Sequence, residues 1–330
     1  MSDTPIALTM GDPAGIGPEL ALLAWREGGH LGAPFFLLAD PGALARLSRR
    51  LGLETPIEVT TPQYAAEVFP HALPVVALAA AADAEPGKPD PAFAQAVIES
   101  IERAVTYTQS GLACAVVTNP IAKKTLYDAG FAHPGHTEFL GELSARAGKP
   151  AEPVMMIWSP LLAVVPVTIH VPLAEVASRL TRGLIEATAR VVDRDLRSRF
   201  GFARPRIAVA GLNPHAGEGG AMGREEIDII APAIAALAAE GLDIFGPLPA
   251  DTMFHARARE KYDVALTMYH DQGLIPAKTL AFDEGVNVTL GLPFVRTSPD
   301  HGTAFDIAGQ GVADPASLIA ALNLAARLSR

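Results

Sequence analysis

The chain has 330 residues, 49% of them hydrophobic, which is enough apolar material for one large domain or for two domains that share a cleft. Its 36 acidic residues outnumber its 26 basic ones, and the formal net charge of -10 argues against a general nucleic-acid-binding protein, because an acidic surface repels phosphate backbones. A single cysteine, Cys114, cannot form an internal disulfide, and the apolar stretches are too short to span a bilayer. We therefore expect a soluble, cytoplasmic protein with no membrane partner.

Short β-rich runs alternate with helical patterns along the chain. The sequence predicts strands at Pro5–Met10, Phe35–Ala39, Leu112–Thr118, Arg206–Leu212 and Asp263–Tyr269. It predicts helices at Pro91–Gln109 and Arg224–Ala239, because apolar residues recur in both at helical spacing. Such an alternation is typical of an α/β fold with a largely parallel sheet.

One pair of predicted strands breaks this alternation. Val154–Trp158 and Leu161–Ile169 are separated only by Ser159-Pro160, so they predict an antiparallel hairpin. An antiparallel segment in an otherwise α/β chain indicates a second domain, which we expect to begin after about Gly130.

Three histidines, His170, His215 and His270, lie just past the carboxyl ends of predicted strands, where α/β folds place their ligands. Three His ligands with one open position form a catalytic metal site, in which the ion polarises a substrate oxygen. Asp271 could orient an imidazole, and Asp251 could act as a base, as a supporting residue or as a helix cap. Taken singly, each histidine is more often a capping or loop residue. The histidines without such a context are expected at the surface: His30, His71, His133 and His255.

Two groups of residues indicate an anion-binding site. His136 and Thr137 precede a predicted helix, with Thr137 as its N-cap, so they would lie beside exposed amides that suit phosphate. Lys278, Asn287 and Arg296 follow one another at nine-residue intervals in a Gly- and Pro-rich region, and the two long cations suggest recognition of a phosphate or carboxylate. The alternatives are a plain N-cap and solvated surface charge.

Six sequence blocks occur in order from Met10 to about Asp314. They are MGDPAGIGPE, GHTEFL, GLNPHAGEGG-x-MG-x-EE, GPLPADT-x-F, MYHDQGLIP-x-K and GVN-x-TLGLPF-x-RTS-x-DHGTA. With these blocks the chain resembles the 4-hydroxythreonine-4-phosphate dehydrogenase family of pyridoxal phosphate biosynthesis. The segment HGTAFDIAGQG also resembles part of the more distantly related isocitrate and isopropylmalate dehydrogenases.

The resemblance implies a two-domain α/β fold of the isocitrate and isopropylmalate dehydrogenase type. Its sheets would be mostly parallel with an antiparallel segment, and its active site would lie in the interdomain cleft. A discontinuous dinucleotide-binding domain would cover residues 1–130 and 285–330, and a metal, substrate and dimerisation domain would cover residues 131–284. The family further implies a homodimer in which each active site is shared between chains.

The resemblance also assigns roles to residues that match the family motifs. The implied metal ligands are His170, His215 and His270. The implied substrate-binding residues are His136, Thr137, Lys278, Asn287 and Arg296. The implied cofactor-binding residues are His301, Gly302, Thr303, Ala304 and Asp306. The candidate catalytic residues are Asp251, Asp271 and Lys278. Pro299 is an insertion relative to several family members, although it touches no ligand position.

The implied reaction is the NAD- or NADP-dependent oxidation of 4-phosphooxy-L-threonine to 2-amino-3-oxo-4-phosphooxybutanoate, which decarboxylates to 3-amino-2-oxopropyl phosphate. A divalent zinc, magnesium or cobalt ion would lower the pKa of the substrate hydroxyl, and hydride would pass to the nicotinamide. Two alternatives stay open. One is a related dehydrogenase acting on erythronate phosphate or an aromatic dihydrodiol, and the other is a metal-dependent hydrolase or isomerase without a dinucleotide.

Overall fold

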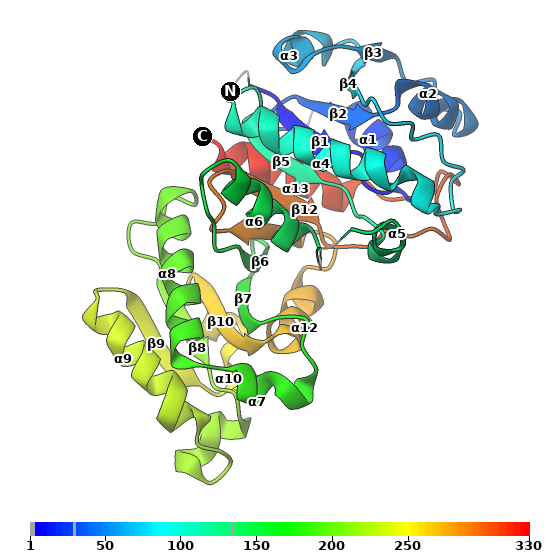
Figure 1. The fold of residues 1–330 in the computed structure, drawn as a ribbon. Coiled ribbons are helices and arrows are strands. Elements are labelled where there is room, and N and C mark those ends of the chain that lie inside the picture. The colour runs from blue at the N-terminus through cyan, green and yellow to red at the C-terminus, as the bar shows by residue number, and fades with distance from the viewer. Residues whose placement is uncertain (1–3, 29–30, 132, 134) are drawn as a thin grey trace. The chain divides into compact units, whose positions relative to one another are not determined.

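The computed structural model describes residues 4–28, 31–131, 133 and 135–330 (Figure 1). The chain divides into two compact units. Unit 1 comprises Met1–Ala151 and Leu292–Arg330, and unit 2 comprises Glu152–Gly291. Each unit is an α/β structure with its own strands and covering helices.

Unit 1 contains a parallel sheet. Its strands are β1 (Ile6–Thr9), β2 (Phe35–Ala39), β3 (Ile57–Val59), β4 (Leu73–Ala77), β5 (Ala115–Thr118) and β12 (Val295–Pro299). They run in the order β3-β4-β2-β1-β5-β12, and every neighbouring pair is parallel. Strands β1, β2 and β5 are buried along their whole length, as expected when helices cover both faces of a parallel sheet.

Helices cover the two faces of the unit 1 sheet. They are α1 (Gly17–Arg26), α2 (Pro41–Arg50), α3 (Ala65–Val68), α4 (Ala94–Gln109), α5 (Lys123–Asp128), α6 (His136–Arg146) and α13 (Ala316–Leu328), with short 3-10 turns at Pro62–Tyr64 and Pro91–Phe93. Helix α4 packs on β1 and β2, whereas α13 packs on β12 and β5, and Figure 1 shows α4 in front of the sheet and α13 behind it.

Unit 2 contains the antiparallel segment. Its strands are β6 (Val154–Trp158), β7 (Ala163–Thr168), β8 (Arg206–Ala210), β9 (Asp243–Leu248), β10 (Val264–Tyr269) and β11 (Val286–Leu290). They run in the order β11-β6-β7-β10-β8-β9. The β11–β6 and β6–β7 pairs are antiparallel, which confirms the predicted hairpin, and β7, β10, β8 and β9 are parallel to one another.

The helices of unit 2 are shorter on average and include irregular turns. They are α7 (Val176–Arg179), α8 (Arg182–Ser198), α9 (Ala231–Ala239), α10 (Ala250–Met253), α11 (Ala256–Arg259) and α12 (His270–Leu280), with a 3-10 turn at Leu173–Glu175, a π-helical turn at Glu226–Ile230 and a further turn at Pro214–Gly220. Among the described residues of both units, no helix is long and apolar enough to cross a membrane.

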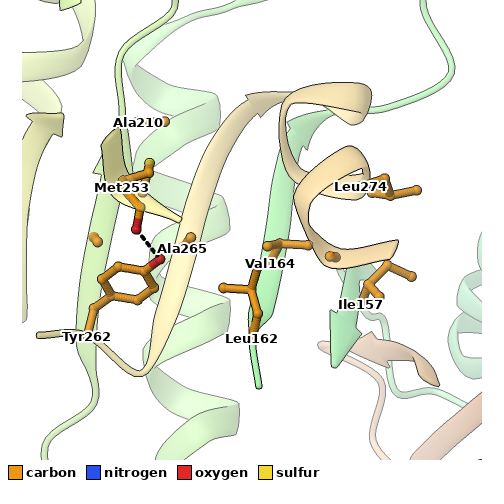
Figure 2. Packing of buried hydrophobic residues seen from close by; sticks show 10 residues of the cluster. Ile157, Leu162, Val164, Ala210, Met253, Tyr262, Ala265 and Leu274 are labelled. Atoms are coloured by element: carbon orange, nitrogen blue, oxygen red, sulfur yellow. Dashed lines mark hydrogen bonds between the residues drawn. The ribbon is translucent and has the colours of Figure 1, made fainter. Parts of the chain in front are cut away.

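A buried apolar cluster fixes the elements of unit 2 that carry candidate site residues (Figure 2). Val164 of β7 and Leu274 of α12 belong to it, so α12 is held against the strand that precedes His170. Tyr262 also belongs to it, and its hydroxyl donates a 2.7 Å hydrogen bond to the carbonyl of Met253 in α10. Burial raises the pKa of Tyr262 to about 12, so this donor keeps its proton at neutral pH.

The unit boundaries differ from the expected domain boundaries. The structure assigns residues 131–151 to unit 1 and residues 285–291 to unit 2. The cause is local packing: α6 lies against α4 within unit 1, and β11 pairs with β6 within unit 2. His136 and Thr137 therefore belong to unit 1, with the residues expected to bind the cofactor. The expected active site in an interdomain cleft stays a prediction.

The predicted strands and helices are present, with shifted ends. Strands β1, β5, β8 and β10 are shorter than predicted, and the helix expected over Arg224–Ala239 begins with the π-helical turn. Helix α6 begins at His136, so its N-cap is Gly135 and the prediction of Thr137 as the N-cap is wrong. Gly135 has an extended backbone and makes no side-chain cap. Thr137 is the second residue of the helix and lies inside its first turn.

Candidate functional site

Two of the expected metal histidines line one pocket at the carboxyl edge of the unit 2 sheet. His170 follows β7 and His270 follows β10, and these strands are parallel neighbours. The centroids of the two imidazole rings are 5.6 Å apart. Asp271 and Leu173 line the same pocket. We call His170, His270 and Asp271 the histidine pocket.

Asp271 sets the orientation of the His270 ring. Its carboxylate oxygen Oδ1 lies 2.7 Å from Nδ1 of His270. A carboxylate accepts the Nδ1 proton, so the lone pair of the neutral imidazole lies on Nε2. Metal-binding histidines are commonly held in this way, because the second hydrogen bond fixes the tautomer and makes the ligating nitrogen more basic.

The third expected ligand, His215, does not line this pocket. It is exposed and lies in the turn Pro214–Gly220 that follows β8, the strand next to β10. Within the part of the chain that the structure describes, no group of three or more His, Cys, Asp and Glu side chains is placed to hold a metal ion. One chain therefore gathers two of the three expected histidines and leaves the third apart.

The backbone is strained at two of these histidines. The φ angles of His170 and His215 are 50° and 52°, in the left-handed region that residues with a Cβ rarely adopt. His215 opens a run of left-handed residues that also contains Ala216 and Glu218. Each such residue costs roughly 1–2 kcal/mol, so the surrounding contacts must hold the turn in place. Strain of this kind tends to concentrate at functional sites.

The remaining unit 2 candidates lie on elements next to the histidines. Asp251 is exposed in the first turn of α10, which packs beside the turn that carries His215. Lys278 is in the last turn of α12, the helix that begins at His270. Asn287 is half-buried on β11. The structure does not gather these three side chains into the histidine pocket.

Arg296, Lys123 and His136 form a second group in unit 1, which we call the cationic cluster. Arg296 on β12 is only 4% exposed and donates a 2.6 Å hydrogen bond to Oγ1 of Thr118, at the end of β5. Burial lowers its pKa to about 10, so it stays protonated at neutral pH. The pKa of His136 is well below its usual value because of burial, and next because of the positive charges of Arg296 and Lys123.

The cationic cluster is arranged as an anion site would be. Nε2 of His136 is enclosed and has no hydrogen-bond partner among the described residues. The Arg296 and Lys123 charges act on that imidazole, and an anion bound among them would satisfy Nε2 and relieve the repulsion. Sequence reasoning did not select Lys123 or Thr118. The available signal was their position at and just past the carboxyl end of a predicted strand.

The residues expected to bind the cofactor lie in unit 1 as an irregular loop over residues 301–306. The loop rests on the Gly-rich segment after β1, because Ile16 donates its amide to the carbonyl of Thr303 at 3.0 Å. Farther on, the buried carboxylate of Glu19 accepts a 2.9 Å hydrogen bond from the amide of Gly309. Nε2 of His301 is buried and has no hydrogen-bond partner among the described residues.

A further pocket of unit 1 is lined by apolar side chains and by the charged side chains of Asp40, Arg46, Arg50 and Asp83. Met10, Pro13 and Pro18 of the Gly-rich segment line it together with Pro86, and Pro86 packs against Gly309. The segment MGDPAGIGPE, which matched no phosphate-binding motif, therefore supports the loop and forms one wall of the pocket.

The histidines expected at the surface vary in exposure. His71 and His255 are exposed, and His255 caps α11 through Nδ1. His133 departs from the expectation: it is half-buried, its ring lies 5.0 Å from the ring centroid of Phe139, and it pairs with Glu142 at 3.1 Å. His30 lies outside the described residues.

Comparisons with known proteins agree on one family. The family model described as pyridoxal phosphate biosynthetic protein PdxA matches residues 32–325. A 4-hydroxythreonine-4-phosphate dehydrogenase of Methylorubrum populi is 64% identical over 99% of this chain and 95% of its own length. The crystal structure of the same enzyme from Klebsiella pneumoniae has a TM-score of 0.85 and 38% identity, covering 99% of this chain and 100% of that one. A terephthalate 1,2-cis-dihydrodiol dehydrogenase structure from Burkholderia xenovorans has a TM-score of 0.66 and 30% identity, covering 98% of both chains.

Proposed function

The chain belongs to the PdxA family of pyridoxal phosphate biosynthetic proteins, and we propose that it oxidises 4-phosphooxy-L-threonine with NAD or NADP as the hydride acceptor. The 2-amino-3-oxo-4-phosphooxybutanoate product would decarboxylate to 3-amino-2-oxopropyl phosphate. The carboxylate is β to the ketone, so when carbon dioxide leaves, the electron pair of the broken bond is stabilised as an enolate. The observation that carries this proposal is the cationic cluster of Arg296, His136 and Lys123, which suits a phosphate ester.

The cationic cluster would bind the substrate phosphate. Arg296 offers a planar set of donors and stays charged, and His136 offers Nε2 as a further donor once a phosphate oxygen approaches. Thr137, half-buried in the first turn of α6, lies next to His136. Lys278 and Asn287, which match substrate-binding residues of the family motif, are proposed contacts to the rest of the substrate.

The histidine pocket would hold a divalent cation through His170 and His270, with His215 as the third ligand. The fit rests on the hydrogen bond between His270 and Asp271, which leaves Nε2 of His270 as a donor to a metal. Imidazole ligands favour zinc or cobalt over magnesium, which prefers oxygen. A bound cation would lower the pKa of the substrate hydroxyl. Asp271 keeps the His270 ring in place, and Asp251 and Lys278 are the proposed residues for proton transfer.

A second copy of the chain would complete this site. Leu173, which lines the histidine pocket, is 72% exposed, and Ile275 on α12 and Phe282 just after it are 65% and 74% exposed. Large apolar side chains exposed beside a site mark a surface that a partner covers. We therefore propose a twofold dimer in which His215 of one chain joins His170 and His270 of the other.

Subunit mixing tests the shared site. Each of the variants His170→Ala, His215→Ala and His270→Ala should be almost inactive alone. After exchange of subunits, a mixture that contains His215→Ala with either other variant should recover about a quarter of wild-type activity, because half the dimers are mixed and each has one intact site. The mixture of His170→Ala with His270→Ala should not recover. Recovery in no mixture, with exchange demonstrated, would show that each site lies within one chain.

The loop over residues 301–306 is proposed to bind the dinucleotide. His301, Gly302, Thr303, Ala304 and Asp306 match the motif that holds this cofactor in the related dehydrogenases. The support in this chain is the buried Nε2 of His301, which has no hydrogen-bond partner among the described residues, and the contact of the loop with the Gly-rich segment through the carbonyl of Thr303.

A substrate panel tests the proposed reaction. We expect nicotinamide reduction with 4-phosphooxy-L-threonine, a much slower rate with 4-hydroxy-L-threonine, which lacks the phosphate, and little reduction with erythronate phosphate, which lacks the amino group. An aromatic cis-dihydrodiol should react far more slowly, because it offers the cationic cluster no phosphate. Preference for the dihydrodiol would support the alternative suggested by the Burkholderia xenovorans structure. Turnover of a phosphorylated substrate without nicotinamide reduction would favour a hydrolase or isomerase.

A further inference from the structure

The turn that carries His215 is held by a residue outside the turn. From His215 to Gly219 every residue has a positive φ, between 43° and 80°. Local hydrogen bonds join the turn to its flanks: the amide of Ala216 donates to the carbonyl of Asn213 at 3.1 Å, the amide of Ala221 to that of Glu218 at 3.3 Å, and the amide of Met222 to that of Gly217 at 3.1 Å. The run contains three residues with a Cβ, His215, Ala216 and Glu218, so it is strained and contacts from outside the turn help to hold it.

Glu226 supplies that support. It begins the π-helical turn before α9 and is only 3% exposed. Its Oε1 accepts hydrogen bonds from the backbone amides of Leu212 and Asn213, both at 2.7 Å, and its Oε2 accepts one from Nδ2 of Asn213 at 3.0 Å. Among the described residues no ion pair joins Glu226, so backbone and amide donors satisfy its charge.

The turn is also shaped around the Glu226 carboxylate. A Cβ added to Gly217, whose φ is +80°, would come within 2.5 Å of Oε2. A Cβ added to Gly211, at the end of β8, would lie 3.1 Å from Oε1. The carboxylate therefore occupies the space between the strand end and the turn, and it contacts both.

We propose that Glu226 is a positioning residue for His215: its carboxylate joins the end of β8 to the left-handed turn and so presents His215 to the cation. The inference rests on the proposed function, in which His215 is a metal ligand. Glu225 contributes less, because it is half-exposed and bonds to the side-chain Nδ2 of Asn213, at 2.7 Å, rather than to the backbone amides of the turn.

Two variants of nearly equal size separate hydrogen bonding from packing. Glu226→Gln keeps an oxygen that can accept from both backbone amides, whereas Glu226→Met fills the same space with no such acceptor. The matched control is Asp228→Asn, which makes the same acid-to-amide change on the same turn, where the carboxylate pairs with exposed Arg224. The readouts are hydrogen exchange of the peptide over residues 211–222 in the full-length protein without added metal, and titration with zinc alone.

We expect Glu226→Met to speed exchange of that peptide by about tenfold or more and to weaken zinc binding by about tenfold, because two buried amides lose their acceptor. Glu226→Gln should stay within about threefold of wild type in both measurements, and Asp228→Asn should match wild type. Exchange of a peptide over β6 and β7 serves as the internal reference for global unfolding. Should Glu226→Met fail to fold, Glu226→Asp provides the test, because its shorter carboxylate should loosen the same peptide by about threefold.

Equal exchange in the Gln and Met variants would overturn the proposal, because packing alone would then hold the turn. A looser turn with unchanged zinc affinity would also overturn it, provided that His215→Ala weakens zinc binding. If His215→Ala leaves zinc affinity unchanged, the metal role of His215 is wrong, and with it the claim that Glu226 serves the cation. The difference in hydrogen exchange between Glu226→Met and Glu226→Gln would then report only on what holds the turn. Failure of the Glu226 proposal and failure of the metal role of His215 are therefore distinguishable.

Discussion

The cationic cluster of unit 1 and the histidine pocket of unit 2 differ in how completely one chain builds them. Arg296 and His136 lie on regular elements, and Thr118 fixes the guanidinium through a 2.6 Å hydrogen bond. In unit 2, His170 and His215 have left-handed backbones, and the described residues of one chain do not form a three-ligand metal site. Under the proposed function, the phosphate site would therefore be complete in one chain, whereas the proposed cation site would depend on strained turns and on a second copy of the chain.

Removing the metal should give the largest effect, and it tests whether the histidine pocket of unit 2 holds a cation that the reaction needs. Chelation should lower activity by roughly a thousandfold, because stabilisation of charge by a bound cation is worth several kcal/mol. Zinc or cobalt should restore activity better than magnesium. The measurement is nicotinamide absorbance at saturating substrate, and full activity in metal-free protein would contradict the proposed cation site.

Replacing Arg296 tests whether the cationic cluster of unit 1 binds the substrate phosphate. Arg296→Met should weaken 4-phosphooxy-L-threonine binding by roughly 100-fold, because a buried charge-assisted contact to phosphate is lost. Arg296→Lys keeps the charge without the planar donors and should lose roughly tenfold. Dinucleotide affinity, measured by nicotinamide fluorescence, should change less than about twofold in both variants. Equal losses for substrate and dinucleotide would mean that Arg296 is not specific for the phosphate.

A smaller effect is expected from the residue that orients His270. Asp271→Asn can still accept the Nδ1 proton, but it loses the negative charge, so zinc affinity should fall by roughly tenfold. Titration with zinc measures this change, and Asp228→Asn, the same conversion at an exposed carboxylate of the same unit, is the comparison. Unchanged zinc affinity in Asp271→Asn would show that Asp271 does not support metal binding by His270.

The smallest predicted effect concerns pH and sharpens the unit 1 side. The pKa of His136 in the folded protein is well below its ordinary value of 6.5, first because of burial. Below pH 6.5 the unfolded chain therefore binds a proton that the folded chain does not, and stability falls as pH falls. The free energy of unfolding should drop by about 1 kcal/mol between pH 6.5 and 5.5 through this group, and His136→Gln should remove that part of the slope. Bound phosphate should reduce the slope, because it raises the pKa of His136. Equal slopes in wild type and variant would be evidence against a buried neutral His136.

Much of the architecture followed from local patterns. The apolar runs predicted the strands, and the short Ser159-Pro160 connection predicted the antiparallel hairpin, because each signal lies within a few residues. The rule that ligands gather at the carboxyl ends of strands also selected His170 and His270, which the structure brings to 5.6 Å between ring centroids.

Other parts of the site depended on contacts that no local pattern encodes. Lys123 matters through its charge near His136, which is in another helix, and Glu226 matters through amides more than ten residues earlier in the chain. The left-handed backbone of His215 could not be inferred, because a positive φ at a non-glycine residue depends on the contacts that hold it. The difference between the compact units and the expected domain boundaries has the same cause, since α6 and β11 are placed by packing partners.

The divided unit 1 constrains the order in which a new chain can fold. Strand β12 pairs with β5 and α13 covers it, yet both belong to Leu292–Arg330 and leave the ribosome after all of unit 2. Until then the edge of β5 lacks its neighbour, and the carboxylate of Glu19 lacks the Gly309 amide. All strands of unit 2 lie in one continuous segment, so unit 2 can fold before the last segment of unit 1 has been synthesised. During synthesis, the unpaired edge of β5 is therefore open to mispairing until β12 has been made.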